Sequence, residues 1–231
     1  MLALESLVIR QDDFRLEADL TVPAGAICAV VGPSGAGKST LLNVIAGFFP
    51  ASEGRVLWNG APLDGLDPGD RPVSMVFQDN NLFPHLTTVQ NVALGLRPSL
   101  RLDATEIRTV EDALVRVGLD GLGRRRPGEL SGGQQSRVAL ARVLVRRRPL
   151  VLLDEPFAAL GPALRIEMLD LVREVAADTG ATVLMVSHDP GDARRIADQT
   201  IYLGEGRAHA PEPTQALFAD PPPALAAYLG T

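Results

Sequence analysis

Alternating apolar positions mark the first part of the chain. Hydrophobic and mostly polar residues alternate over residues 14–22, which predicts a half-buried antiparallel strand. Apolar residues within residues 2–9 predict a second, less regular strand. The run at residues 27–31 is short and wholly apolar, as in a strand that is covered on both faces. The first 31 residues are therefore predicted to form strands and their connections.

Later in the chain, the spacing of the apolar residues changes from that of strands to that of helices. Apolar residues recur at helical spacing over residues 106–117, and residues 134–148 form a second such pattern with an arginine-rich end that suits the helix dipole. Further helices are predicted over residues 38–46 and 163–178, and further strands over residues 55–58, 73–77, 150–153 and 182–186. The last 25 residues carry prolines and short helical pieces. This succession predicts an α/β core that is interrupted by a helical insertion.

Composition and charge narrow the class of protein. The 231 residues are 46% hydrophobic, which suits a globular chain with a sizeable core, and one cysteine excludes a disulfide scaffold. The longest uncharged run, residues 20–37, contains four glycines and two prolines, which disfavour a membrane-spanning helix. The net charge of −6 without a long basic block argues against a general nucleic-acid binder. Trp58 and Cys28 are interpreted as packing residues.

A glycine-rich segment lies between the apolar run at residues 27–31 and the predicted helix. It fits the pattern Gly-x-x-x-x-Gly-Lys-Ser/Thr without a mismatch, and such a loop wraps phosphates with backbone N–H groups. Lys38, the only lysine, would reach the β- and γ-phosphates, and Ser39 would offer its hydroxyl to Mg²⁺. The strand–loop–helix context disfavours a chance glycine-rich turn. The predicted nucleotide-binding residues are Gly32, Pro33, Ser34, Gly35, Ala36, Gly37, Lys38, Ser39 and Thr40.

Two carboxylates end the predicted strand at residues 150–153. Carboxylates at the C-terminal edge of a parallel strand stand beside a phosphate loop. Asp154 would hold Mg²⁺, and Glu155 would polarise the attacking water. Alone, the pair would read as solvated acids at a strand end, but the phosphate loop earlier in the chain favours the catalytic interpretation.

A second candidate anion site precedes the predicted helix at residues 134–148. It consists of Leu130, Ser131, Gly132, Gly133 and Gln134, and it resembles the signature of the ATP-binding cassette (ABC) ATPases. Its serine and glycines expose N–H groups at a helix start. One phosphate loop needs no second anion site on its own chain, whereas two chains arranged head to tail can each cap the γ-phosphate of the other. The resemblance extends over nearly the whole chain.

The resemblance implies further residues and a fold. Gln78 matches the glutamine that is a ligand of Mg²⁺ and water, and His188 matches the switch histidine that contacts the γ-phosphate. The implied catalytic set is Glu155, His188 and Lys38, and the implied metal ligands are Ser39, Gln78 and Asp154. The implied fold is one α/β domain over residues 1–231. It has a RecA-like P-loop NTPase core with an N-terminal antiparallel β subdomain (residues 1–84 and 150–231) and an inserted α-helical subdomain (residues 85–149).

Two positions depart from the family pattern. Gln11 stands where the family places an aromatic residue against adenine, and the nearest aromatic residue, Phe14, belongs to the alternating strand and is interpreted as core. Gly161 stands where the loop after Glu155 carries an aspartate in the family, so the carboxylate of that loop is absent. The first departure concerns adenine binding, and the second concerns communication across the dimer.

The family contains membrane-transporter subunits and proteins that act on DNA or ribosomes. One cassette without sustained heptads or a basic surface run favours the transporter subunit, and the signature disfavours a P-loop kinase. In residues 80–87, Phe83 and Leu86 match the place where importer cassettes bind a short helix of the membrane subunit; a packed loop under the helical insertion is the alternative.

The solute is indicated by likeness alone. Residues 71–83 resemble thiamine-importer ATPases, which implies uptake of thiamine or its phosphates, with iron(III) or polyamine import as alternatives. The implied cofactors are ATP and Mg²⁺. The implied partners are a second copy of the chain, an integral-membrane permease and, indirectly, a periplasmic solute-binding protein, without nucleic acid. The implied location is peripheral, at the cytoplasmic face of the inner membrane.

Overall fold

The computed structural model describes residues 1–230, and its strands form one large, curled sheet. The antiparallel part pairs β1 (Leu2–Gln11) with β2 (Phe14–Val22) and β4 (Glu53–Trp58), and the short β5 (Ala61–Pro62) pairs with β4. The register of β1 shifts between Leu4 and Leu7, which explains its irregular apolar pattern.

The second part of the sheet is parallel, in the order β9-β3-β8-β7-β6. Its strands are β3 (Ile27–Val31), β6 (Val73–Val76), β7 (Leu150–Asp154), β8 (Thr182–Val186) and β9 (Gln199–Gly204). Two short strands, β10 (Arg207–Ala208) and β11 (Glu212–Pro213), pair with β9, and β10 also pairs with β2. β10 therefore joins the antiparallel and parallel parts. Strands β9 to β11 were absent from the sequence prediction.

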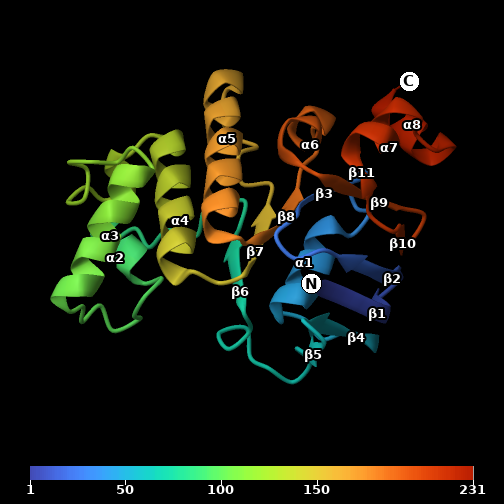
Figure 1. Ribbon diagram of the computed structural model, residues 1–231, viewed down its shortest axis with the longest axis horizontal. Helices are drawn as coiled ribbons and strands as arrows, with labels where there is room; N and C mark the ends of the chain where they lie inside the picture. The colour runs from blue at the N-terminus through green and yellow to red at the C-terminus, as the bar shows by residue number, and fades with distance from the viewer. Residues whose placement is uncertain (231) are drawn as a thin grey trace.

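Helices cover both sides of the parallel strands (Figure 1). They are α1 (Lys38–Ala46), α2 (Thr88–Ala93), α3 (Ala104–Arg116), α4 (Gly132–Arg146), α5 (Pro162–Thr179), α6 (Pro190–Ile196), α7 (Thr214–Ala219) and α8 (Pro223–Leu229), with a short 3₁₀ helix at Pro127–Glu129. The predicted end of α4 at residue 148 is wrong, because Arg147 adopts a left-handed φ of 49° and closes the helix. The predicted start at residue 134 is also late by two residues, since Ser131 caps the helix.

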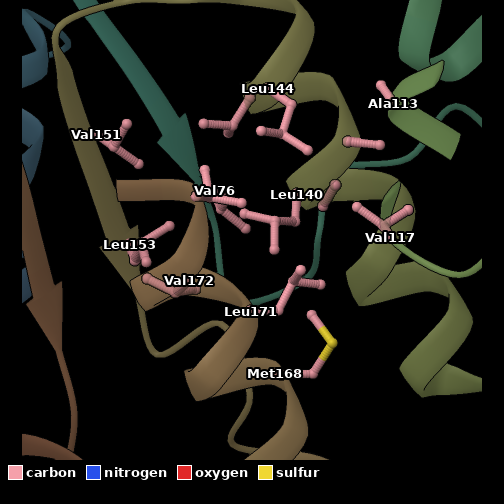
Figure 2. Close-up of a cluster of buried hydrophobic side chains, with 14 of the residues drawn as sticks. Val76, Ala113, Val117, Leu140, Leu144, Val151, Leu153, Met168, Leu171 and Val172 are labelled. Carbon is pink, nitrogen blue, oxygen red and sulfur yellow. The ribbon is translucent and has the colours of Figure 1, made fainter. Parts of the chain in front are cut away.

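Alternate residues of the buried strands enter different cores. Val151 and Leu153 of β7 pack with α3, α4 and α5, and Figure 2 shows them gathered with Leu140 of α4 and Val172 of α5. Leu152 faces the opposite cluster, which contains α1 and the antiparallel strands. This alternation explains why the whole strand is apolar, because both of its faces are covered.

A third, smaller cluster lies over β3 and β9. It contains Val31 and Tyr202 from these strands, together with Leu217 of α7 and Leu225 of α8. The prolines and short helical pieces of the C-terminal segment thus form helices that are packed on the sheet.

Cys28 and Trp58 lie in the core, as predicted. Burial raises the pKa of the Cys28 thiol to about 12. Among residues 1–230, none of the helices combines the length and the apolar character that crossing a membrane requires.

Candidate nucleotide site

The glycine-rich loop connects β3 to α1 and is shaped by two close approaches. A Cβ atom on Gly32 would lie 2.1 Å from the Leu203 backbone oxygen of β9, and Gly32 has a φ of 154°. A Cβ atom on Gly37 would lie 2.4 Å from the ring of Phe14. Gly37 is also the N-cap of α1 and supplies no side-chain cap, so the first N–H groups of the helix face the loop. The loop therefore presents backbone donors to an anion.

Lys38 lies beneath this loop and is 8% exposed. Its Nζ donates hydrogen bonds to the carbonyl oxygens of Gly32 at 2.8 Å and Pro33 at 2.9 Å. Burial lowers the pKa of Lys38, and the nearby carboxylates of Glu155 and Asp154 oppose that shift. The structure thus holds the one lysine of the chain at the predicted phosphate site.

Ser39 and Asp154 meet at the end of the parallel sheet. The Ser39 Oγ donates to Asp154 Oδ1 at 2.8 Å, joining the first turn of α1 to the C-terminal end of β7. Burial raises the pKa of Asp154, although the hydrogen bond from Ser39 acts in the opposite direction. A hydroxyl and a carboxylate are hard oxygen ligands, so this pair has the chemistry that Mg²⁺ requires beside nucleotide phosphates.

Glu155 and His188 face one another across the ends of β7 and β8. Glu155 Oε2 lies 3.4 Å from His188 Nδ1. The Glu155 backbone has a φ of 45°, and its N–H donates to the Val186 oxygen at 3.2 Å. A non-glycine residue in the left-handed region carries local strain, which the contact with β8 holds in place.

An open cavity of about 310 Å³ extends from the phosphate loop to Glu155, and Asp154 and His188 lie behind Ser39 and Glu155 without lining it. It is lined by Gln11, Phe14, Ser34, Gly35, Gly37, Lys38, Ser39, Thr40 and Glu155. Gln11 and Phe14 reach it from the turn between β1 and β2. Phe14 is only half-buried and packs over the loop, so its interpretation as a core residue is incomplete: the ring also forms the rim of the cavity.

The signature residues form the start of α4. Ser131 is the N-cap, and its Oγ accepts from the Gln134 N–H at 3.3 Å while Gln134 Oε1 accepts from the Ser131 N–H at 3.0 Å. A Cβ atom on Gly133 would lie 2.1 Å from Leu164 of α5, so this glycine permits the close packing of two helix starts. Leu130 is buried and Gly132 is exposed beside it.

The chain separates the signature from its own phosphate loop. Figure 1 shows α4 on one side of α5 and β7, and α1 on the other side. Gln78 is exposed two residues beyond β6 and does not line the cavity. The loop that carries Gln78 nevertheless begins at the same edge of the sheet as Asp154, because Val76 at the end of β6 is in register with Leu153, the residue before Asp154.

The loop after Gln78 borders a second cavity of about 390 Å³. Phe83 is 47% exposed at its edge, together with Leu82 and Arg142, while Leu86 is half-buried nearby. Sequence reasoning missed Asn91, which is fully buried. Asn91 Oδ1 accepts from the Phe83 N–H, and Asn91 Nδ2 donates to the oxygens of Phe83 and Leu86. This amide fixes the loop, and no motif pointed to it.

Comparison with known proteins identifies relatives of this chain in sequence and in structure. A thiamine import ATP-binding protein of Cereibacter sphaeroides is 64% identical over 230 residues, and one of a Ruegeria species is 61% identical over 230 residues; both alignments cover 100% of each chain. A solved ATP-binding cassette, dimeric and in a post-hydrolysis state with ADP and Pi, superposes with a TM-score of 0.81 at 30% identity, over 93% of this chain and 99% of that chain.

The family model of the ABC transporter matches residues 16–158, from β2 to the loop that follows Glu155. This region contains the phosphate loop, the loop after Gln78, the signature and both candidate carboxylates. Since the model covers more than half of the chain and the relatives match it over its full length, the chain belongs to the ABC transporter family.

Proposed function

We propose that the chain is the ATP-hydrolysing subunit of an importer for thiamine or its phosphates. One observation supports ATP hydrolysis above the others: Lys38, the Ser39–Asp154 pair and the Glu155–His188 pair converge beside the same phosphate loop. Thiamine as the solute is supported by the two relatives that are named thiamine import proteins and that match the chain over its full length.

Each residue of the site has a proposed role. The loop N–H groups and Lys38 bind the β- and γ-phosphates. Ser39 and Asp154 would hold Mg²⁺, with Gln78 as a further ligand, and the ion would supply positive charge beside the phosphates. Glu155 accepts a proton from the attacking water and orients it, and His188 contacts the γ-phosphate. Phe14, instead of a residue at position 11, offers the aromatic surface nearest to the nucleotide base.

The site is completed by a second copy of the chain. Within the described part of the chain, the N–H groups of Gly132 and Gly133 donate to no hydrogen-bond acceptor. Helix α4 also lies apart from α1. The signature of one chain therefore binds the γ-phosphate held by the other. The dimeric state of the solved cassette supports this arrangement.

The membrane subunit is the second proposed partner. The cavity beside Phe83 is lined by apolar side chains together with Arg142 and Arg146, and Asn91 holds the loop that borders it. A short helix of the permease would lie there and transmit the movement of the loop that begins at Gln78. In that complex the chain would act at the cytoplasmic face of the inner membrane, and the solute-binding protein would act only through the permease.

One experiment tests activity and solute together. The chain is reconstituted with the permease that co-purifies with it, and uptake of labelled thiamine, iron(III) and a polyamine is measured beside ATP turnover. We expect thiamine uptake that depends on ATP. Lys38→Ala should lower ATP turnover by about a hundredfold or more, since one charged contact in a transition state is worth about 3–4 kcal/mol. Uptake of iron(III) or polyamine alone would correct the solute, and full turnover by Lys38→Ala would refute the site.

A further inference from the structure

Helix α8 is anchored beside the loop that carries His188. Leu225 is fully buried in the third cluster, against residues of β3 and β9 that include Val31 and Tyr202. Tyr228 follows Leu225 by three residues and therefore lies on the same side of the helix. The burial of Leu225 thus fixes where the Tyr228 side chain lies.

Tyr228 makes a direct contact with the backbone of the switch loop. Its hydroxyl donates a hydrogen bond to the carbonyl oxygen of His188 at 3.1 Å, across 40 residues of sequence. Burial, followed by the charges of Glu155 and Asp189, raises the pKa of the Tyr228 hydroxyl. The hydroxyl therefore keeps its proton near neutral pH and remains a donor.

The residues on either side of His188 have their own supports. Ser187 Oγ donates to Asp192 Oδ2 at 2.6 Å and accepts from the Asp189 N–H at 3.0 Å. Arg165 of α5 pairs with Asp192 at 2.5 Å and so joins this network to α5. These bonds hold residues 187 and 189. The bond from Tyr228 reaches His188 itself, whose side chain lies 3.4 Å from Glu155.

We propose that Tyr228 is a positioning residue that holds the His188 backbone, and through it the imidazole, in place beside Glu155. Tyr228 does not touch the nucleotide cavity, so it acts through His188. The inference rests on the proposed function, because the role of His188 at the γ-phosphate comes from there. It assigns α8, which lies beyond the region that the family model matches, a part in hydrolysis.

The chain contains two tyrosines, which makes a matched comparison available. Tyr228→Phe keeps the ring and removes the donor, whereas Tyr202→Phe removes a hydroxyl from a ring that stacks on His209 in the same cluster. In the full chain, we expect Tyr228→Phe to lower kcat for ATP about 3- to 10-fold, the worth of one hydrogen bond. The KM for ATP and the melting temperature should remain at their wild-type values, and backbone hydrogen exchange at residues 187–189 should accelerate. Tyr202→Phe should change none of these quantities.

Three results would overturn the inference. An unchanged kcat in Tyr228→Phe would remove any role in hydrolysis. A lower kcat with unchanged hydrogen exchange at residues 187–189 would show that the effect does not pass through His188. A lower kcat with a raised KM and a lower melting temperature would indicate a general structural role. If Lys38→Ala and His188→Ala hydrolyse ATP at the wild-type rate, the proposed site itself fails; if they are inactive while Tyr228→Phe is fully active, only the role of Tyr228 fails.

Discussion

Asp154, a proposed Mg²⁺ ligand, lowers the folding stability when its carboxyl is ionised. Burial raises its pKa, so the folded chain binds this proton more tightly than the unfolded chain does. Above the pKa of the folded state, the ionised carboxylate therefore lowers the free energy of unfolding, and this penalty disappears as the pH falls through that pKa. Asp170 shows the opposite shift, because a hydrogen bond from Arg195 lowers its pKa.

Asp154→Asn should consequently raise the melting temperature of the nucleotide-free chain at pH 7 while it abolishes Mg²⁺-dependent ATP hydrolysis. The amide oxygen can still accept the bond from Ser39. The gain should shrink as the pH is lowered, since the wild-type carboxyl then becomes neutral as well. Asp170→Asn is the control and should lower the melting temperature at pH 7. Thermal unfolding of both variants between pH 4 and pH 8 checks this, and a loss of stability in Asp154→Asn at pH 7 would contradict it.

At the residue scale, sequence reasoning is strongest where chemistry needs adjacent residues. The phosphate loop is a continuous motif, and the structure brings Lys38 and Ser39 to the carboxylates of Asp154 and Glu155. Asn91 and Tyr228 have no such signal. Their contacts reach a loop eight residues earlier and a carbonyl 40 residues earlier, and only the folded chain brings these groups together.

At the scale of elements, the start of α5 changes the expectation for Gly161. Gly161 has a φ of −66° and a ψ of 158°, the extended conformation of an N-cap, and an added Cβ would meet no atom within 4 Å. It supplies no side-chain cap, and Pro162 follows at the first helical position. The backbone at this position therefore suits aspartate, which is a favoured N-cap residue.

Gly161→Asp should raise the free energy of unfolding by about 0.5–1 kcal/mol, through the cap and through reduced freedom of the unfolded chain. It should also make the dependence of ATP turnover on ATP concentration steeper, if the loop carboxylate links the two sites of the dimer. Gly65→Asp is the matched control: its added Cβ is equally free of contacts, but its φ of 77° strains an aspartate. Equal melting temperatures for wild type and Gly161→Asp, with unchanged cooperativity, would make Gly161 a neutral replacement.

Most elements follow from local pattern, and the exceptions are informative. Residues 27–31, 38–46 and 182–186 have the predicted bounds, because each is a clear apolar or amphipathic run next to glycine or loop residues. Strand β9 was missed although residues 200–203 are buried and rich in β-formers. Strands β10 and β11 have two residues each and exist only through pairing with β9 and β2, so their formation depends on tertiary context.

At the scale of the whole molecule, the separation of α4 from α1 leads to a prediction about assembly. Glu155→Gln should lower ATP hydrolysis about a hundredfold or more, the usual contribution of a general base, while ATP binding persists. ATP and Mg²⁺ should then hold two copies together. Size-exclusion chromatography with light scattering should show a dimer for Glu155→Gln with ATP and a monomer without it. Glu174→Gln, an exposed substitution on α5, is the control and should behave like the wild type. A monomeric Glu155→Gln chain at high ATP would contradict the head-to-tail arrangement.

Coupling to the membrane can be separated from hydrolysis at Phe83. The ring is 47% exposed at the edge of the second cavity, so its removal should leave the fold and the ATP turnover of the isolated chain close to wild type. In the reconstituted importer, Phe83→Ala should lower thiamine uptake by about tenfold or more, as expected for an aromatic anchor of an interface. Ile107→Ala removes a side chain of similar exposure, 44%, on α3 and should leave uptake unchanged. Parallel loss of uptake and turnover with a lower melting temperature would support the packed-loop interpretation instead.

The position of Lys38 also allows occupancy of the nucleotide site to be measured by chemical modification of this one side chain. Apart from the N-terminus, whose amine is bonded to Asn59, this side chain carries the only primary amine of the molecule. Its lowered pKa increases the fraction present as the free, nucleophilic base at neutral pH. An acylating reagent should therefore mark one internal position, and ATP should protect it. The acylated fraction of a single peptide would then report the occupancy of the site, averaged over the copies of the chain, without any engineered residue.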